Sequence, residues 1–142
     1  MNSHFLSWFS GFFDGEGYIS IVPNNKSGYM PQVVIKLRKD DKSILLRIKE
    51  TLCIGAVYDI NNVSTGSPQS KWQVADIDGC VKLIDVLDNY PLLAKKKEVY
   101  KVWRSAVLYM KENGRNKHDD YIESAISKMK GLRKYNSTNK SN

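Results

Sequence analysis

The sequence contains few of the residues that build zinc sites and disulfide frameworks. There are two cysteines, Cys53 and Cys80, and two histidines, His4 and His118, among 142 residues. Each cysteine lies in an apolar run without a partner at metal-ligand spacing, so we expect two small buried thiols in a reducing compartment. The wide separation of the histidines argues against a Cys/His zinc site and against a histidine-based nuclease motif.

Features of several other protein classes are also missing. No apolar run is long enough to span a bilayer, so we expect no membrane partner. The N-terminus lacks the basic segment of a secretion signal, and no serine triad or nucleotide-binding glycine loop is recognisable. Positive charge, in contrast, is in excess: 22 Lys and Arg stand against 15 Asp and Glu, for a net charge of +7. Nucleic acid is the leading candidate partner for such a basic surface.

The hydrophobic pattern predicts an α+β domain. Residues 3–15 have apolar side chains at helical spacing, with Ser3 as the N-cap. The predicted strands cover residues 18–22, 32–38, 56–60 and 71–77, and the remaining helices cover residues 41–52, 79–89, 92–111 and 119–132. Two hairpins separated by a helix predict one antiparallel four-stranded sheet with helices on one face. Residues 1–133 form a single domain in this prediction, and residues 134–142 form a disordered basic tail.

Two acids stand at the end of the first predicted helix, where Gly15 and Gly17 are expected to terminate it. A helix C-terminus carries partial negative charge, so Asp14 and Glu16 are both unfavourable there. The two glycines add a backbone-entropy cost. A segment that is locally unfavourable for stability indicates a function. The local pattern also fits an ordinary alternative, in which Asp14 forms a cap or an ion pair and Glu16 is a solvated turn residue.

Small residues form a stripe along the same helix. Ser7, Gly11 and Gly15 are spaced four apart, which lets another helix approach closely. Because the chain has no second copy of the stripe, the simplest partner is the same helix of a second subunit, across a two-fold axis. Two Glu16 carboxylates would then lie close together and require a divalent cation, and Mg²⁺ suits both carboxylate and phosphate oxygens.

The segment Phe9–Gly17 resembles the LAGLIDADG motif at every position, with the sequence Phe-Ser-Gly-Phe-Phe-Asp-Gly-Glu-Gly. The elements predicted after the motif follow the order ββαββα, which is the order of that homing endonuclease family. The stretch Tyr90–Leu93, with its following lysines and the downstream Trp103, is similar to the third region of the family. The resemblance therefore extends over nearly the whole chain.

The resemblance implies a homodimeric endonuclease that binds double-stranded DNA under a saddle-shaped sheet. The motif helix forms the dimer interface, through Ser7, Gly11 and Gly15. Glu16 binds the catalytic metal together with Gly15, and Asp14 is mainly structural. The implied cofactor is Mg²⁺, and Mn²⁺ or Ca²⁺ can substitute for it in binding.

The resemblance also implies which polar residues surround the metal. Lys96 is expected to be the basic active-site residue, with Lys95 and Lys97 as phosphate contacts or solvated charges. Lys39 and Asp40 are both candidates for positioning the attacking water. The implied reaction is metal-dependent hydrolysis of both DNA strands, leaving short 3′ overhangs and initiating intron homing. A homodimer implies a near-palindromic target of about 20 base pairs.

Alternation along the strands predicts which side chains face DNA. The set expected to pack on the helices is Ile19, Ile21, Val33, Ile35, Leu37, Trp72 and Val74. The set expected to contact DNA, including the first hairpin loop, is Ser20, Asn24, Lys26, Gln32, Val34, Lys36, Arg38, Tyr58, Lys71 and Gln73. Within it, lysine and arginine can read guanine and glutamine can read adenine. Asn25 and Tyr29 are further candidates for outer bases, and the basic residues at positions 111, 115, 117 and 130–140 for phosphates.

A second function is compatible with the same fold and charge. The chain could be a non-cleaving maturase that assists the splicing of intron RNA, or a DNA-binding regulator; the presence of Glu16 favours the enzyme. We expect an intracellular location: a mitochondrion or chloroplast in a eukaryote, otherwise a bacterium or a phage-infected cell.

Overall fold

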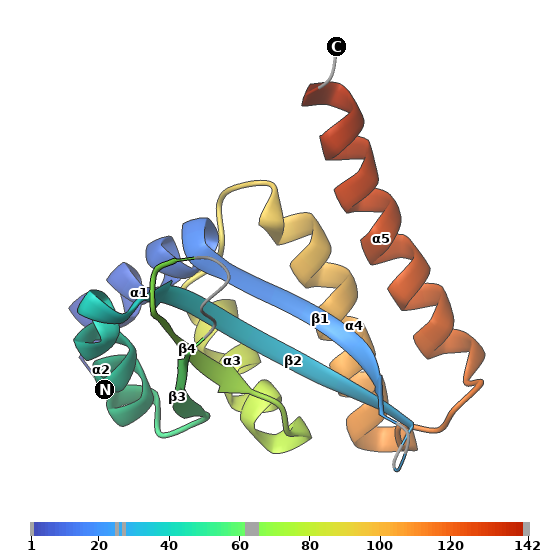
Figure 1. Ribbon diagram of the computed structural model, residues 1–142. Helices are drawn as coiled ribbons and strands as arrows, with labels where there is room; N and C mark the ends of the chain where they lie inside the picture. The colour runs from blue at the N-terminus through green and yellow to red at the C-terminus, as the bar shows by residue number, and fades with distance from the viewer. Residues whose placement is uncertain (1, 25, 27, 62–65, 141–142) are drawn as a thin grey trace.

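A four-stranded sheet and five α-helices make up the fold (Figure 1), seen in a computed structural model that describes residues 2–24, 26, 28–61 and 66–140, with side chains to residue 134. The elements, in chain order, are α1 (Ser3–Glu16), β1 (Gly17–Asn24), β2 (Gly28–Arg38), η1 (Lys39–Asp41), α2 (Lys42–Leu52), β3 (Ala56–Ile60), β4 (Gln69–Val74), α3 (Ile77–Asn89), α4 (Lys96–Asn113) and α5 (Asp120–Lys140). The predicted α+β class is confirmed.

The sheet is antiparallel throughout, with the strand order β1-β2-β4-β3. Helices α3 and α4 lie behind the sheet in Figure 1, and the face toward the viewer carries no helix across its centre. The side chains of Val33, Ile35, Trp72 and Val74 are fully buried on the helix side. Tyr18 and Tyr58, on the other side, are half exposed. The predicted alternation of the strands is therefore confirmed.

Helix α1 begins and ends differently from the prediction. The side chain of Asn2, not Ser3, caps the helix, because its Oδ1 accepts hydrogen bonds from the backbone N–H groups of His4 and Phe5, at 2.9 and 3.3 Å. The helix then continues across Gly15 and ends at Glu16. The buried apolar face of the helix holds Gly15 in helical conformation despite its low propensity.

The boundary between β4 and α3 also lies earlier than predicted. Alternation suggested a strand to Ile77, but the strand ends at Val74. The Oδ2 of Asp76 accepts a hydrogen bond from the N–H of Gly79 at 2.8 Å, which is an N-cap contact that starts α3 at Ile77.

The last helix is capped by an aspartate and is longer than predicted. The Oδ1 of Asp119 accepts hydrogen bonds from the N–H groups of Tyr121 and Ile122, at 2.9 and 3.2 Å. Helix α5 runs past Leu132, where the prediction ended it. The division of the chain at residue 133 into a domain and a tail stays a prediction. None of the described helices is long and apolar enough to cross a membrane.

The two cysteines differ in exposure. Cys80 is fully buried, and burial raises the pKa of its thiol to about 12. Cys53, in contrast, is exposed as the left-handed C-cap of α2, with a φ of 58°. The prediction of two buried thiols is wrong for Cys53, because the residue that terminates a surface helix is turned toward solvent.

The tip of the β1–β2 hairpin is joined to the α4–α5 connection. The N–H of Tyr29 donates to the carbonyl of Arg115 at 2.8 Å, and its hydroxyl donates to Glu123 at 3.0 Å. At Gly28, where φ is +90°, any Cβ would overlap the Arg115 carbonyl. Tyr29 is thus occupied in anchoring the hairpin, which argues against a role in reading bases. Asn25 lies outside the described residues.

Candidate active site

Glu16 is the exposed last residue of α1, at the border of the open sheet face. With Tyr18, Val34, Lys36 and Lys71 it lines a shallow depression on that face. Its carboxylate has no hydrogen bond or ion pair with any other residue that the structure describes. A carboxylate that no described residue pairs with through a hydrogen bond or ion pair is available for a ligand.

Asp14 has a different environment, in which it organises the segment before α4. Its Oδ2 accepts hydrogen bonds from the backbone N–H groups of Leu93 and Ala94, both at 2.8 Å. Its Oδ1 is buried without a hydrogen-bond partner among the described residues. Asp14 thus holds the segment just before α4, which begins at Lys96 rather than at the predicted Leu92. The geometry supports a structural role for Asp14.

Ser10, one helical turn before Asp14, also contacts this segment. The hydroxyl of Ser10, which is buried, donates to the carbonyl of Tyr90 at 2.5 Å. Residues 90–96 are therefore fixed to α1 at more than one point along the helix.

Lys96 covers the end of α1. Its Nζ donates to the carbonyls of Phe13 and Asp14 at 3.0 and 3.1 Å, so the ammonium group caps the negative end of the helix. Burial lowers the pKa of Lys96; Asp14 and Glu16 oppose that effect, and Arg133 adds to it. The structure thus brings Lys96 and Glu16, distant in sequence, to the same helix end.

The end of α1 offers oxygen ligands that fit a hard divalent cation. The carboxylate of Glu16 is one, and the neighbouring carbonyl of Gly15 lies beyond the two carbonyls that Lys96 caps. No group of three or more His, Cys, Asp and Glu side chains suited to a metal occurs among the described residues. Among the described residues, the end of α1 therefore offers one carboxylate and a backbone carbonyl as candidate metal ligands.

The open sheet face is basic. Lys36 on β2 lies directly opposite Lys71 on β4, which in turn lies opposite Tyr58 on β3. Like charges at directly opposed positions destabilise a sheet, and the outward positions of the described strands include no acid to compensate. The Nζ of Lys71 is 5.8 Å from the Tyr58 ring centroid. A polyanionic ligand would relieve this repulsion.

The other residues predicted to contact DNA occupy the same face or the hairpin tip. Cross-strand pairs join Ser20 to Gln32 and Val34 to Gln73, and Arg38 is exposed at the end of β2. At the tip, the Oδ1 of Asn24 accepts a hydrogen bond from the N–H of Lys26 at 3.0 Å. The predicted set is thus divided between the open sheet face and the hairpin tip, and its contacts with DNA stay a prediction.

The two predicted water-positioning residues lie elsewhere. Lys39 and Asp40 belong to η1, beyond the end of β2, where Lys39 forms an ion pair with Asp59 at 3.8 Å. Neither lines the depression that contains Glu16. Lys36, in contrast, lines this depression together with Glu16. The predicted end of the strand at Arg38 is confirmed, and the water-positioning role of Lys39 and Asp40 stays a prediction.

The predicted small-residue stripe is an exposed surface. Ser7, Gly11 and Gly15 are all exposed, and a Cβ added at either glycine would meet no atom within 4 Å. Beside them, Trp8 is 41% exposed and stacks on Phe12 with ring centroids 4.7 Å apart. Nothing within the described chain requires glycine at these positions, so the stripe suits the approach of another helix.

One of the basic residues expected to contact phosphates occupies a position near the site that the sequence did not predict. Arg133 on α5 stacks over the ring of Tyr18, with its Cζ 4.6 Å from the centroid, and its Nη2 donates to the carbonyl of Ile19. The sequence places Arg133 in a general basic stretch, and no local signal relates it to β1.

Comparison with known proteins identifies the family and its relatives. Residues 9–107 match the model of the LAGLIDADG endonucleases. The probable intron-encoded endonuclease Cox1-I1b of Schizosaccharomyces pombe is 29% identical over 95% of this chain, which spans 36% of that protein. The LAGLIDADG meganuclease I-AabMI, solved bound to uncleaved DNA, is 26% identical with a TM-score of 0.69, over 80% of this chain and 38% of its own.

A second solved structure has the same fold over almost its full length. The homing endonuclease I-TnaI matches with a TM-score of 0.67 and 18% identity, over 89% of this chain and 97% of its own. The chain thus spans about a third of the curated relative but nearly all of this smaller protein. The matched residues 9–107 include most of the motif helix, the whole sheet and the segment that Asp14 and Lys96 organise. This chain belongs to the LAGLIDADG endonuclease family.

Proposed function

We propose that the chain is a subunit of a Mg²⁺-dependent, site-specific DNA endonuclease that initiates intron homing. The observation that carries the proposal is the Glu16 carboxylate, which is exposed and without a partner among the described residues at the border of a basic sheet face. The solved relative bound to DNA and the relative called an intron-encoded endonuclease support it. The similarity to the uncharacterized mitochondrial protein RF1 of Saccharomyces cerevisiae, 26% identical over 74% of this chain, favours the mitochondrion among the expected locations.

Each part of the site has a separate task in this proposal. The basic face, including Lys36 and Lys71, binds the phosphates and base edges of the major groove. Glu16 and the carbonyl of Gly15 hold the metal ion, which when bound supplies Lewis-acid activation of water and phosphate. Lys96 places a half-buried positive charge where negative charge develops on the scissile phosphate. Asp14 keeps Lys96 in place by fixing the preceding turn.

A second active site comes from a second copy of the chain. Two α1 helices pair along Ser7, Gly11 and Gly15, which brings the two Glu16 carboxylates to the same end of the helix pair. The open space around both glycines, where an added Cβ would meet no described atom within 4 Å, supports this pairing. The two-fold symmetry requires a near-palindromic target of about 20 base pairs.

The test uses a library of randomised DNA duplexes incubated with the protein and Mg²⁺, followed by capture and sequencing of the cut ends. The wild-type protein is expected to cut a defined sequence, and Glu16→Gln is expected to bind that sequence without cutting it. Glu50→Gln, which removes an exposed acid on α2, is the matched control and should cut normally.

Two results would contradict the assignment. Cutting by Glu16→Gln at the wild-type rate would remove the metal role of Glu16, and loss of DNA binding by the same variant would make it structural. If the wild-type protein bound intron RNA but neither bound nor nicked any duplex, the maturase alternative would replace the enzyme.

A further inference from the structure

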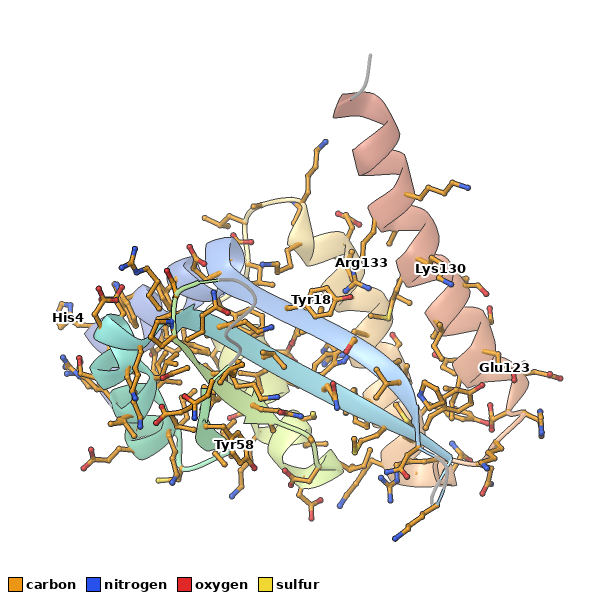
Figure 2. The ribbon with its side chains drawn as sticks, viewed as in Figure 1. His4, Tyr18, Tyr58, Glu123, Lys130 and Arg133 are labelled. Carbon is orange, nitrogen blue, oxygen red and sulfur yellow. The ribbon has the colours of Figure 1, made fainter. Side chains whose placement is uncertain are left out.

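A second pocket adjoins the Glu16 depression, and Tyr18 forms the wall between them. Residues that line this pocket include Asp14, Tyr18, Lys95, Lys96, Val99 and Arg133. Tyr18 also lines the depression that holds Glu16. Figure 2 shows Arg133 on α5 beside Tyr18 on β1, and Lys130 lies about one turn earlier on the same helix. A ligand in this pocket would therefore contact Tyr18 and Lys96, which both lie close to Glu16.

The pocket has an excess of positive charge. Lys95, Lys96 and Arg133 contribute three cations, and Asp14 is the one acid among the lining residues. The Oδ2 of Asp14 is already occupied by two backbone N–H groups, and Lys96 is occupied by the end of α1. Lys95 and Arg133 thus remain to attract an anion.

Arg133 is held in a fixed position rather than extended into solvent. Its guanidinium stacks on the Tyr18 ring and donates to the carbonyl of Ile19. That bond uses one of the five N–H donors of the group, and no carboxylate of the described residues forms an ion pair with Arg133. A planar guanidinium that is already ordered suits bidentate binding of a phosphate, because little rotamer entropy remains to be lost.

Arg133 lies beyond the residues that the family model covers. The family match ends at residue 107, whereas α5 begins at Asp120. Helix α5 lies along the outer side of β1 in Figure 1, so it enlarges the DNA-facing surface beyond the edge of the sheet.

We propose that the pocket between β1, α4 and α5 binds one backbone phosphodiester of the DNA, through Arg133 and Lys95, next to the phosphate that is cut. The site rests on the proposed function, since it needs a DNA strand that crosses the border of the sheet at Glu16. By holding this phosphate, the pocket fixes the path of the DNA strand where it passes between Tyr18 and α5.

Phosphate-ethylation interference tests the site. The probe is a duplex recovered from the randomised library, partly ethylated on its phosphates and bound by the Glu16→Gln protein with Ca²⁺. We expect a small set of phosphates whose ethylation blocks binding, one of them adjoining the cut position. In Glu16→Gln/Arg133→Ala, interference at that phosphate should disappear, and affinity for the unmodified duplex should fall roughly 10- to 100-fold, as for a hydrogen bond to a charged group.

Matched variants separate phosphate binding from a structural effect. Lys95→Ala changes an exposed side chain that forms no hydrogen bond or ion pair with the described residues, so it should remove the same interference without affecting the fold. Lys128→Ala removes a charge from the part of α5 that lines the groove with Lys101 and should leave the pattern unchanged. If the same phosphate still interferes in both the Arg133 and the Lys95 variants, the site is refuted. If the Glu16→Gln protein binds no duplex at all, it is the proposed function that fails.

Discussion

Replacing Gly11 with alanine sets two effects of opposite sign against each other. Gly11 lies in the middle of α1, is exposed, and has no atom within 4 Å of the position of an added Cβ. In a single chain, alanine should therefore stabilise the helix by about 0.8–1.0 kcal/mol over glycine. For a domain of this size, that gain corresponds to a rise in Tm of roughly 3–5 °C.

The same methyl group is unfavourable if two α1 helices pair along this stripe. Overpacking of a close helix contact costs about 1–3 kcal/mol, so the dissociation constant of the dimer should rise about 5- to 140-fold. Sedimentation velocity over a concentration series measures the dissociation constant. Thermal unfolding at low and high protein concentration measures the stability, because the Tm of a dimer depends on concentration.

Gly131→Ala is the matched control, since Gly131 is also helical, exposed and without an atom within 4 Å of an added Cβ. It should raise the Tm without changing the dissociation constant. The reasoning would be refuted if Gly11→Ala behaved as Gly131→Ala does, because the stripe would then not be the contact between subunits.

Three further predictions concern single side chains. Lys36→Gln should weaken the binding of a cognate duplex by about 1–3 kcal/mol, measured by fluorescence anisotropy. Because the change removes one of two opposed lysines, it should leave the unfolding free energy unchanged or raise it. A lower unfolding free energy would make Lys36 structural. A thiol reagent should label Cys53 in the native protein and Cys80 only in denaturant; rapid labelling of both would contradict the burial. The hydrogen bonds from Arg104 hold the pKa of Asp88 below its usual range. The ion pair therefore stabilises the folded protein above the pKa that Asp88 has in the unfolded chain, and this contribution is lost as the pH falls through the pKa of Asp88 in the folded protein. In denaturant titrations, Asp88→Asn should thus cost about 0.5–1 kcal/mol at neutral pH and nothing at strongly acid pH; a constant difference would argue against the pair.

The sheet was predictable because its signal is local. Alternation assigns Val33, Ile35 and Trp72 to the buried side from the sequence alone, and the structure confirms this assignment. Element ends were less predictable, because a cap depends on which of two adjacent polar residues reaches the backbone. Ser3 and Asn2 are both good cap residues, and only the geometry shows that Asn2 is used.

The candidate site was only partly predictable for a related reason. The motif itself identifies Glu16 and Asp14, whose positions are fixed by one helix. The hydrogen bond between Asp14 and Leu93 and the stacking of Arg133 on Tyr18 join segments far apart in sequence. Periodicity and spacing have no information on such contacts, so they emerge only from the packing of α4 and α5 against β1.

The anchoring of the β1–β2 hairpin has a consequence for changing the target sequence. Tyr29 fastens one arm of the hairpin to Arg115 and Glu123, and Gly28 permits the close approach. The backbone at Lys26 is thereby supported by Tyr29 and by the Oδ1 of Asn24, and not by the side chain of Lys26 itself. Exchanging the Lys26 side chain should redirect base preference at the outer end of each proposed half-site without reshaping the hairpin, which makes Lys26 a suitable position for retargeting the protein.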